Sequence, residues 1–374
     1  MKLFFSSMLF VFVLAGVLVG CDDPNVQRPV IEDLGMIGVM GFDYVDDERI
    51  KVNISLPQPQ HDAEEQVQSF STVVRMPHQS VMDISTLTEK VLSPLQLRVL
   101  LFSEEYATKV GLWKVLENLY RDPQVGTNIF IAVVKGTTEE VIKRDYKDKP
   151  EINVYLNELL KPRVMTAFSP FTTIHYFINK STDEVSDPST PYLEIVNENS
   201  LKITNVALFS GDKMVGMLDA EESKLVQAMK KRKNLPDISV MIPGPNGDDE
   251  REMAILKFVS TKFSAEANGD LENPELFLHF YVRGSIVDYD GASDLASLEE
   301  RKEVEEKISK GLEERVMKTV RQFQELGVDP GGFGEYFRVK APREWSKENW
   351  NEVLKQTKVT AHVEVRIIST GTIR

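Results

Sequence analysis

The sequence predicts an α+β protein with three domains of mixed or antiparallel sheets and helices packed on one face. The chain has 374 residues, more than one ordinary hydrophobic core accommodates, so several domains are expected. Strand-like and helix-like segments alternate along its first half. Its last part combines a long amphipathic helix with a strand of alternating apolar and polar residues. These observations together favour separate sheets with helices against them.

Composition narrows the class of partner. Hydrophobic residues make up 42% and charged residues 27%, which is typical of a folded protein. The net charge is −14 and the pI is about 5.0. Nucleic acid is therefore not expected as a partner, because phosphate binding needs a basic surface. The single cysteine excludes an intramolecular disulfide and a thiolate-rich zinc site.

That single cysteine, Cys21, follows a nearly unbroken apolar run over residues 3–19. The run ends in small residues, which is typical of a removable signal peptide over residues 1–20. An uncleaved anchor helix is the alternative, since about 20 apolar residues span a bilayer. The segment 18–21 resembles the lipobox of bacterial lipoproteins, in which the cysteine sulfur is acylated. Cys21 is therefore the predicted lipidation site, and the polar residues 21–30 are the predicted lipid-anchored tether.

Residues 31–190 are predicted to form an N-terminal α/β domain. Its first glycines have the spacing G-x-x-G-x-x-G over 35–41, which is not the dinucleotide fingerprint and favours strands with close backbone packing. A strand is expected over 50–56, and the Ser93-Pro94 pair is typical of a helix start. A second helix after residue 111, a buried strand near 127–136 and a helix capped by Thr137 or Thr138 complete the alternation.

Residues 183–191 are rich in Ser, Thr, Pro and Asp and form the predicted linker. A middle α+β domain is then expected over 195–268. It contains two strands joined by a hairpin at 210–213 and a helix opened by a capping box of Asp219 and Glu222. A further strand follows the helix.

A C-terminal α+β domain with a long helix is expected over 271–374. A strand near 275–289 is followed by an amphipathic helix over 298–326, which Gly327 ends. The terminal strand over 358–367 has one apolar and one polar face, which favours an antiparallel sheet with helices on one side.

Motifs for catalysis or cofactor binding are missing from the sequence. The five histidines have no short metal-binding spacing, and three of them, His175, His279 and His362, fall in strand-like runs. Neither a P-loop nor a G-x-S-x-G elbow is present. The acidic segment 286–297 fails as a calcium loop, since Ser297 stands where a bidentate glutamate is required. We therefore expect a non-catalytic protein with no cofactor and no metal.

A basic cluster, residues 230–233, has two interpretations. Cations at a helix C-terminus interact favourably with the helix dipole. Alternatively, the cluster contacts anionic lipid head groups, an interpretation that depends on a lipid anchor at Cys21.

The glycine- and aromatic-rich segment 329–345 also has two interpretations. Its aromatic residues pack back on the long helix, which is the favoured interpretation, or they form an exposed surface that docks a partner. The candidate docking residues are Phe333, Tyr336, Phe337 and Trp345.

Several separated segments resemble the Ger(x)C family, the C-subunit lipoproteins of nutrient germinant receptors in spore-forming bacteria. The resemblance covers nearly the whole chain and is strongest at the segment GFGEYFRVKAPREW and the terminal VEVRIISTGTI. IEDLGMIGVMGFD, LLFSEEYA, LYRDP and ALFSGDKMVGMLDAEE precede them in the same order. The stretch after Cys21 departs from the family pattern, because it is longer and lacks a tryptophan.

The resemblance implies a non-catalytic subunit on the outer face of the spore's inner membrane, needed for nutrient-triggered germination. It also implies assembly with two integral membrane partners, an A and a B subunit. It does not say whether this subunit contacts a small molecule directly. The alternative is a solute-binding lipoprotein of a transporter, which would have two similar α/β lobes around a cleft. A lipid-anchored hydrolase would require a catalytic motif that the sequence lacks.

Overall fold

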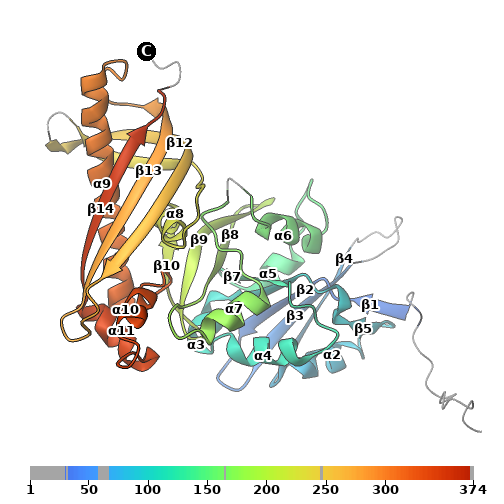
Figure 1. Ribbon diagram of the computed structural model, residues 1–374. Coiled ribbons are helices and arrows are strands. Elements are labelled where there is room, and N and C mark those ends of the chain that lie inside the picture. The colour runs from blue at the N-terminus through green and yellow to red at the C-terminus, as the bar shows by residue number, and fades with distance from the viewer. Residues whose placement is uncertain (1–29, 31–32, 58–66, 164–165, 245–246, 371–374) are drawn as a thin grey trace, which may run out of the picture.

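The computed structural model describes residue 30 and residues 33–57, 67–163, 166–244 and 247–370. Two sheets organise these residues, an eight-stranded sheet in the first part of the chain and a four-stranded sheet in the last part (Figure 1). A small parallel pair, β1 (Leu34–Met36) with β5 (Val91–Ser93), lies beside the large sheet. The mixed sheets and their helices confirm the predicted α+β class.

The eight-stranded sheet has the order β10-β9-β8-β7-β6-β2-β3-β4. Its strands are β2 (Val39–Tyr44), β3 (Ile50–Pro57), β4 (Val67–Val74), β6 (Val99–Ser103), β7 (Phe130–Val134), β8 (Ser189–Asn197), β9 (Ser200–Ser210) and β10 (Lys213–Asp219). The central strands β2, β6, β7 and β8 run parallel, whereas the strands at both margins pair antiparallel. Parallel strands need crossover connections, so helices accumulate around the centre.

Helices cover both faces of the large sheet. One face packs on α2 (Pro77–Ile84), α3 (Glu104–Lys109), α4 (Trp113–Arg121) and α7 (Ile174–Ser181), and the other packs on α5 (Thr138–Lys143) and α6 (Ile152–Leu160). A hydrophobic core lies on each face of the sheet, and consecutive side chains of β7 point into them alternately. Ile131 and Val133 belong to the core under α2, α3, α4 and α7, and Ala132 and Val134 to the core under α5 and α6. The expectation of helices on one face therefore does not describe this sheet.

The prediction of a helix directly after Ser93-Pro94 is wrong. A 3-10 turn, η2 (Pro94–Gln96), uses the cap and the proline, and the apolar run after it is the central strand β6. Every residue of β6 is buried because helices cover both sides of it. A short apolar run buried on both faces has no period that separates strand from helix.

The predicted linker over 183–191 also differs. Residues 186–190 are buried, and β8 begins within the segment at Ser189. Because β8 pairs with β7 on one side and with β9 on the other, the sheet continues through the predicted boundary between residues 190 and 195. The hairpin of β9 and β10 and the Asp219–Glu222 capping box of α8 (Ala220–Met229) are confirmed.

The four-stranded sheet has the order β11-β12-β13-β14. Its strands are β11 (Ile238–Gly244), β12 (Gly247–Ala267), β13 (Glu275–Tyr289) and β14 (Lys358–Ile367). The long helix α9 (Leu298–Leu326) and α8 pack on one face of this sheet, together with α10 (Gly334–Lys340) and α11 (Lys347–Gln356) (Figure 1). Its other face carries no helix of the described chain, as the alternating burial of β13 and β14 predicts.

The direction of β14 differs from the antiparallel prediction. β14 lies parallel to β13, with Leu276 opposite Val359 and Val282 opposite Val365. The chain between these strands contains α9, α10 and α11, which together make the crossover that a parallel pair requires. Alternation of apolar residues identifies a half-buried strand but does not give its direction.

The two sheets are joined through packed side chains. Leu208 and Leu218, from β9 and β10 of the large sheet, belong to the same hydrophobic cluster as α8, α9 and the small sheet. Gln322 of α9 also donates to the carbonyl of Met217 in β10, at 2.9 Å. The two parts of the molecule therefore share one continuous core at their junction.

Candidate functional site

A crevice lies where three neighbouring parallel strands of the large sheet end. β2, β6 and β7 end at Tyr44, Ser103 and Val134, on the same edge of the sheet. From β6 the chain continues into α3 on one face, and from β7 it continues into α5 on the other. In α/β sheets, this divergence of adjacent connections leaves the crevice in which ligands bind. We call it the strand-end crevice.

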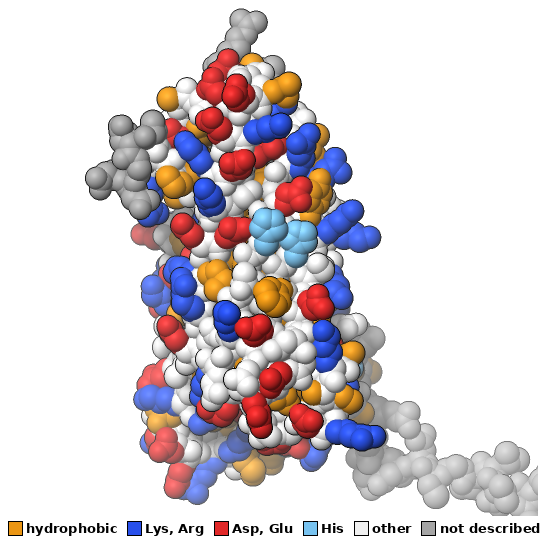
Figure 2. Space-filling view, turned by 60° about the vertical axis from the view of Figure 1, so that its left-hand side comes forward, with side chains coloured by type: hydrophobic (Ala, Val, Ile, Leu, Met, Phe, Trp, Pro, Cys, Tyr) orange, Lys and Arg blue, Asp and Glu red, His pale blue; other side chains and the backbone are white. Residues whose placement is uncertain are grey.

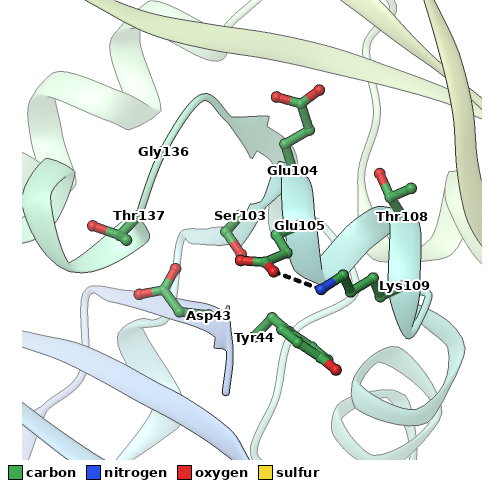
Figure 3. Close-up of a pocket in the computed structure, with 9 residues that line it drawn as sticks. All are labelled: Asp43, Tyr44, Ser103, Glu104, Glu105, Thr108, Lys109, Gly136 and Thr137. Atoms are coloured by element: carbon green, nitrogen blue, oxygen red, sulfur yellow. Dashed lines mark hydrogen bonds and ion pairs between the residues drawn. The ribbon is translucent and has the colours of Figure 1, made fainter. Parts of the chain in front are cut away.

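The strand-end crevice encloses a cavity of about 440 Å³ (Figure 3). Its walls come from the end of β2, the start of α3 and the loop before α5. The lining residues are Asp43, Tyr44, Ser103, Glu104, Glu105, Thr108, Lys109, Gly136 and Thr137. Three carboxylates and one amine give the crevice an acidic character.

Asp43 holds the start of α5 against β2. It accepts hydrogen bonds from the backbone N–H groups of Thr138 (2.7 Å) and Glu139 (3.2 Å) and from the side chain of Asn53 (2.8 Å). Burial raises the pKa of Asp43 above its ordinary value, and the two backbone N–H groups oppose that shift. The role of Asp43 visible in the fold is therefore to position α5.

The glycines of the segment 35–41 explain why α5 comes so close. A Cβ on Gly41 would lie 2.3 Å from the hydroxyl of Thr138, and one on Gly38 would lie 2.7 Å from Asn153 of α6. Only glycine allows helices to approach β2 at these distances. The prediction of close backbone packing in this segment is confirmed.

The remaining charged side chains of the strand-end crevice all have partners. Glu105 and Lys109 form an ion pair at 2.8 Å across the middle of Figure 3, and the Lys109 ammonium lies over the Tyr44 ring at 4.3 Å. Glu104 accepts from the hydroxyl of Tyr192 at 2.6 Å. The Ser103 hydroxyl caps α3 by accepting from the N–H of Tyr106. This arrangement suits binding of a small polar molecule better than activation of a nucleophile.

The predicted docking residues lie elsewhere, around α10, and the docking interpretation fails for two of them. Phe333 and Phe337 are 0% exposed, so they cannot dock a partner. Their rings pack on Phe323 of α9 (6.3 Å between centroids) and on Trp350 (5.2 Å). The packing interpretation holds for both rings, because their burial in this core removes a large apolar area from water.

Tyr336 and Trp345 are half-buried against the same core. The Trp345 ring lies 5.1 Å from the Trp350 ring, and a Cβ on Gly334 would lie 2.5 Å from Trp345. The glycine therefore makes room for a tryptophan pair. The four aromatic residues do not form one exposed surface.

Sequence reasoning missed the group that organises this segment, Asp329. Its carboxylate accepts from the backbone N–H groups of Phe333 (2.9 Å) and Gly334 (2.8 Å) and from Nε1 of Trp350 (3.1 Å). Burial raises the pKa of Asp329 to about 6, and the nearby Asp187 carboxylate adds to the shift. An aspartate directly before Pro-Gly-Gly and an aromatic run was the available signal.

Asp187 links this cluster to the large sheet. Its carboxylate accepts from the N–H of Asp329 at 2.7 Å, and its own N–H donates to the Asp329 carbonyl at 3.1 Å. Asp187 lies just before β8, so these two bonds connect the large sheet to the segment that follows α9. We call the pair the Asp187–Asp329 junction.

The other predicted site residues are scattered. His279 and His362 stack on the exposed face of the small sheet, with ring centroids 5.3 Å apart, whereas His175 lies in α7 rather than in a strand. In the described part of the chain, no three His, Cys, Asp or Glu residues are placed to hold a metal ion. No described helix is long and apolar enough to cross a membrane. Cys21 and residues 1–29 lie outside the described residues.

Comparisons with known proteins show which proteins the chain resembles. The model of the spore germination protein N-terminal domain matches residues 27–195, and the model described as spore germination B3/GerAC-like, C-terminal, matches residues 204–371. The spore germination protein GerQC of Bacillus cereus is 22% identical, over 96% of this chain and 97% of that protein. The spore germination protein YndF of Bacillus subtilis is 21% identical, over 76% of this chain and 70% of that protein.

The fold has a solved counterpart. The crystal structure of the GerBC protein superposes with a TM-score of 0.53 at 17% identity, covering 88% of this chain and 96% of that chain. The two family models together span both sheets, and each covers a segment in which the sequence already resembled the family. The chain is therefore a member of the Ger(x)C family of spore germination proteins.

Proposed function

We propose that this chain is the lipid-anchored, non-catalytic C subunit of a nutrient germinant receptor. Family membership supports the C-subunit role, because the two models match residues 27–195 and 204–371 in order. The lipobox-like segment ending at Cys21 supports attachment by a thioether-linked diacylglyceryl group. Two acyl chains anchor a protein stably, whereas one chain binds only reversibly.

In this proposal the mature protein sits on the outer face of the spore's inner membrane and assembles with integral membrane A and B subunits. Its contribution to germination is contact with those partners. Two features of the strand-end crevice support a non-catalytic role: Glu105 and Lys109 are paired with each other, and the Ser103 hydroxyl caps α3.

Spores carrying Cys21→Ala test the anchor. We expect them to germinate poorly with nutrients and normally with dipicolinate or dodecylamine, which act without the receptor. Mass spectrometry of the mature N-terminus should find a diacylglyceryl group on Cys21 in the wild-type protein. Spores carrying Asp22→Asn keep the thiol and are the matched control.

Normal nutrient germination of Cys21→Ala spores at an unchanged protein level would contradict the anchor. Co-purification of the A and B subunits with the wild-type chain tests assembly separately. A solute-binding lipoprotein would instead show nutrient binding in calorimetry of residues 22–374. The two unlike sheets give no support to that alternative, which requires two similar lobes.

A further inference from the structure

An exposed aromatic residue of the small sheet lies among exposed cations that have no acidic partner in the described part of the chain. Phe258 in β12 is 75% exposed, the largest exposure among the large hydrophobic side chains of the described chain. The Lys257 ammonium lies 5.7 Å from the centre of its ring. Lys262, Arg283, Lys231 and Lys233 are also exposed. We call these six residues the Phe258 patch.

Strand register brings the cations together. Lys257 pairs with Ser285, Lys262 with Tyr281, and Arg283 with Ser260 between them. Neighbouring strands lie about 4.8 Å apart, so Arg283 borders both lysines of β12. On the other side of β12, the N–H of Thr261 donates to the carbonyl of Lys233, which attaches the basic segment after α8 to the same strand.

The charge of the patch is unusual for this protein. The chain carries 58 acidic and 44 basic side chains, yet none of the five cations has an acidic partner within 4.0 Å among the described residues. The acidic Glu364 lies two strands from Lys262. Figure 2 shows Lys and Arg side chains gathered toward the right-hand edge of this view, beside the pale-blue histidine pair.

Backbone conformation supplies an independent observation. Three residues other than glycine have positive φ in the described chain, and two of them, Lys231 (φ 62°) and Phe258 (φ 55°), belong to this patch. Bulky side chains disfavour this left-handed conformation. Lys231 follows Lys230, the C-cap of α8, and occupies the position at which glycine is usual after a helix. Phe258 lies at a shift in the register between β12 and β13. Strained residues that persist at one surface indicate use of that surface.

We propose that the Phe258 patch docks on an anionic lipid bilayer, as a second membrane contact besides the anchor. Lysines and arginines attract the anionic head groups, and an aromatic ring suits the boundary between head groups and acyl chains. The choice of a bilayer over another polyanion rests on the proposed function, since Cys21 would hold the chain at a membrane. Lys257, Lys262 and Arg283 lie on the helix-free face, so the contact turns that face of the small sheet toward the lipid.

Flotation of residues 22–374 with vesicles tests the proposal without the anchor. This segment contains every described residue, so every contact reported above is kept, and circular dichroism checks its fold. We expect binding to phosphatidylcholine vesicles that contain phosphatidylglycerol, weakening as salt is added, and no binding to phosphatidylcholine alone. A failed Cys21 experiment would leave this result unaffected, because the fragment carries no lipid.

Charge removal gives the decisive comparison. Lys257→Gln with Lys262→Gln and Arg283→Gln should weaken binding about a hundredfold, since each surface cation contributes about fivefold near an anionic bilayer. The matched control replaces three cations of α9, which packs on the opposite face of the sheet: Lys302→Gln, Lys310→Gln and Arg321→Gln. The control should bind like the parent.

Phe258→Gly separates docking from folding. Glycine tolerates positive φ, so this variant should melt at a higher temperature than the parent while binding anionic vesicles more weakly. Equal losses in both triple variants would overturn the proposal, and so would unchanged binding in Phe258→Gly. Binding of a single-stranded oligonucleotide through the same residues, without vesicle binding, would assign the patch to nucleic acid and overturn it too.

Discussion

Asp329 is completely buried, yet its carboxylate organises the segment in which the resemblance to the family is strongest. Two backbone N–H groups and the Trp350 indole converge on it. These donors lie at the start of α10 and on α11, so the carboxylate joins the two helices where Phe333 and Phe337 enter the core. The three donors offset part of the cost of burying this charge, and burial together with the nearby Asp187 carboxylate still raises its pKa.

Asp329→Asn should destabilise the protein by about 1–3 kcal/mol at neutral pH. The amide nitrogen of asparagine donates rather than accepts, so at least one buried N–H group loses its acceptor. Urea unfolding measures the change. Glu344→Gln, an exposed substitution in the same segment, is the control and should be neutral. Equal stability of the two variants would contradict this role of Asp329.

The raised pKa of Asp329 also predicts a pH dependence. Its pKa is about 6 in the folded chain against 3.8 as the ordinary value, so between these pH values the folded state binds more protons than the unfolded state. The free energy of unfolding therefore falls by about 3 kcal/mol, from this group, as the pH rises through that interval.

Asp329→Asn lacks this contribution, so its deficit relative to the wild type should be largest near pH 4 and smallest above pH 6. Unfolding of both proteins across this range, compared pair by pair, cancels the titration of all other groups. A deficit that does not change with pH would contradict the raised pKa.

At the scale of elements, α9 covers the β14 edge of the small sheet. Glu305 and Glu313 accept from the backbone N–H groups of Ile367 (2.7 Å) and Val363 (2.8 Å), and the Ser309 hydroxyl accepts from Val365 (3.2 Å). Four residues along a helix rise about 6 Å, close to two residues along a strand, so the acceptors match every second N–H group. An open edge would offer these N–H groups to another chain.

Replacing both glutamates, Glu305→Ala with Glu313→Ala, should lower the free energy of unfolding by about 2–4 kcal/mol. It should also cause self-association that grows with concentration, because β14 then presents unpaired N–H groups. Urea unfolding and light scattering after gel filtration measure the two effects. Glu306→Ala with Glu314→Ala removes the same charge from the exposed side of α9, and self-association of this control to the same extent would refute the explanation.

At the scale of the whole molecule, the Asp187–Asp329 junction and the shared core hold the two sheets together. The side chains of Leu208 and Leu218 make the apolar part of that contact. Polar contacts add to it: the two buried hydrogen bonds of Asp187, and the bond from Gln322 to the Met217 carbonyl. Coupling of this kind makes two units unfold as one.

Asp187→Ala should uncouple them. The N–H of Asp329 loses its acceptor, so we expect calorimetry to resolve two transitions where the wild type shows one, with the first at lower temperature. Glu184→Ala, an exposed substitution three residues earlier, is the control. A single transition in Asp187→Ala, merely shifted, would show that the remaining contacts couple the sheets without Asp187: Leu208, Leu218 and the Gln322–Met217 hydrogen bond.

Sequence periodicity was informative where one face of an element is wet. The helix over 298–326, its end at Gly327 and the alternation of β14 are as expected, because a solvent-exposed face leaves a polar stripe in the sequence. Local capping chemistry was equally readable, as at Asp219 with Glu222, since its partners lie within three residues.

Periodicity failed where both faces are buried. The sequence predicts a helix start at Ser93-Pro94, but residues 99–103 of the apolar run that follows form the central strand β6, which has helices on both sides. A different limit hid the continuation of the sheet through β8. The Ser, Thr, Pro and Asp residues over 183–191 predict a linker from local composition, whereas pairing with the distant β7 makes residues from Ser189 onward a strand.

The sequence by itself determined the family, the α+β class and the amphipathic elements, because each rests on residues close together in the chain. Lipidation at Cys21 is a prediction from the same kind of local pattern. Tertiary structure decided the rest. Only pairing across the chain could show that β14 runs parallel to β13, that Phe333 and Phe337 are buried rather than exposed, and that Asp187 meets Asp329. It alone placed Phe258 beside cations from three segments, because contacts between distant residues depend on how the sheets close and pack, and local propensity carries no record of that.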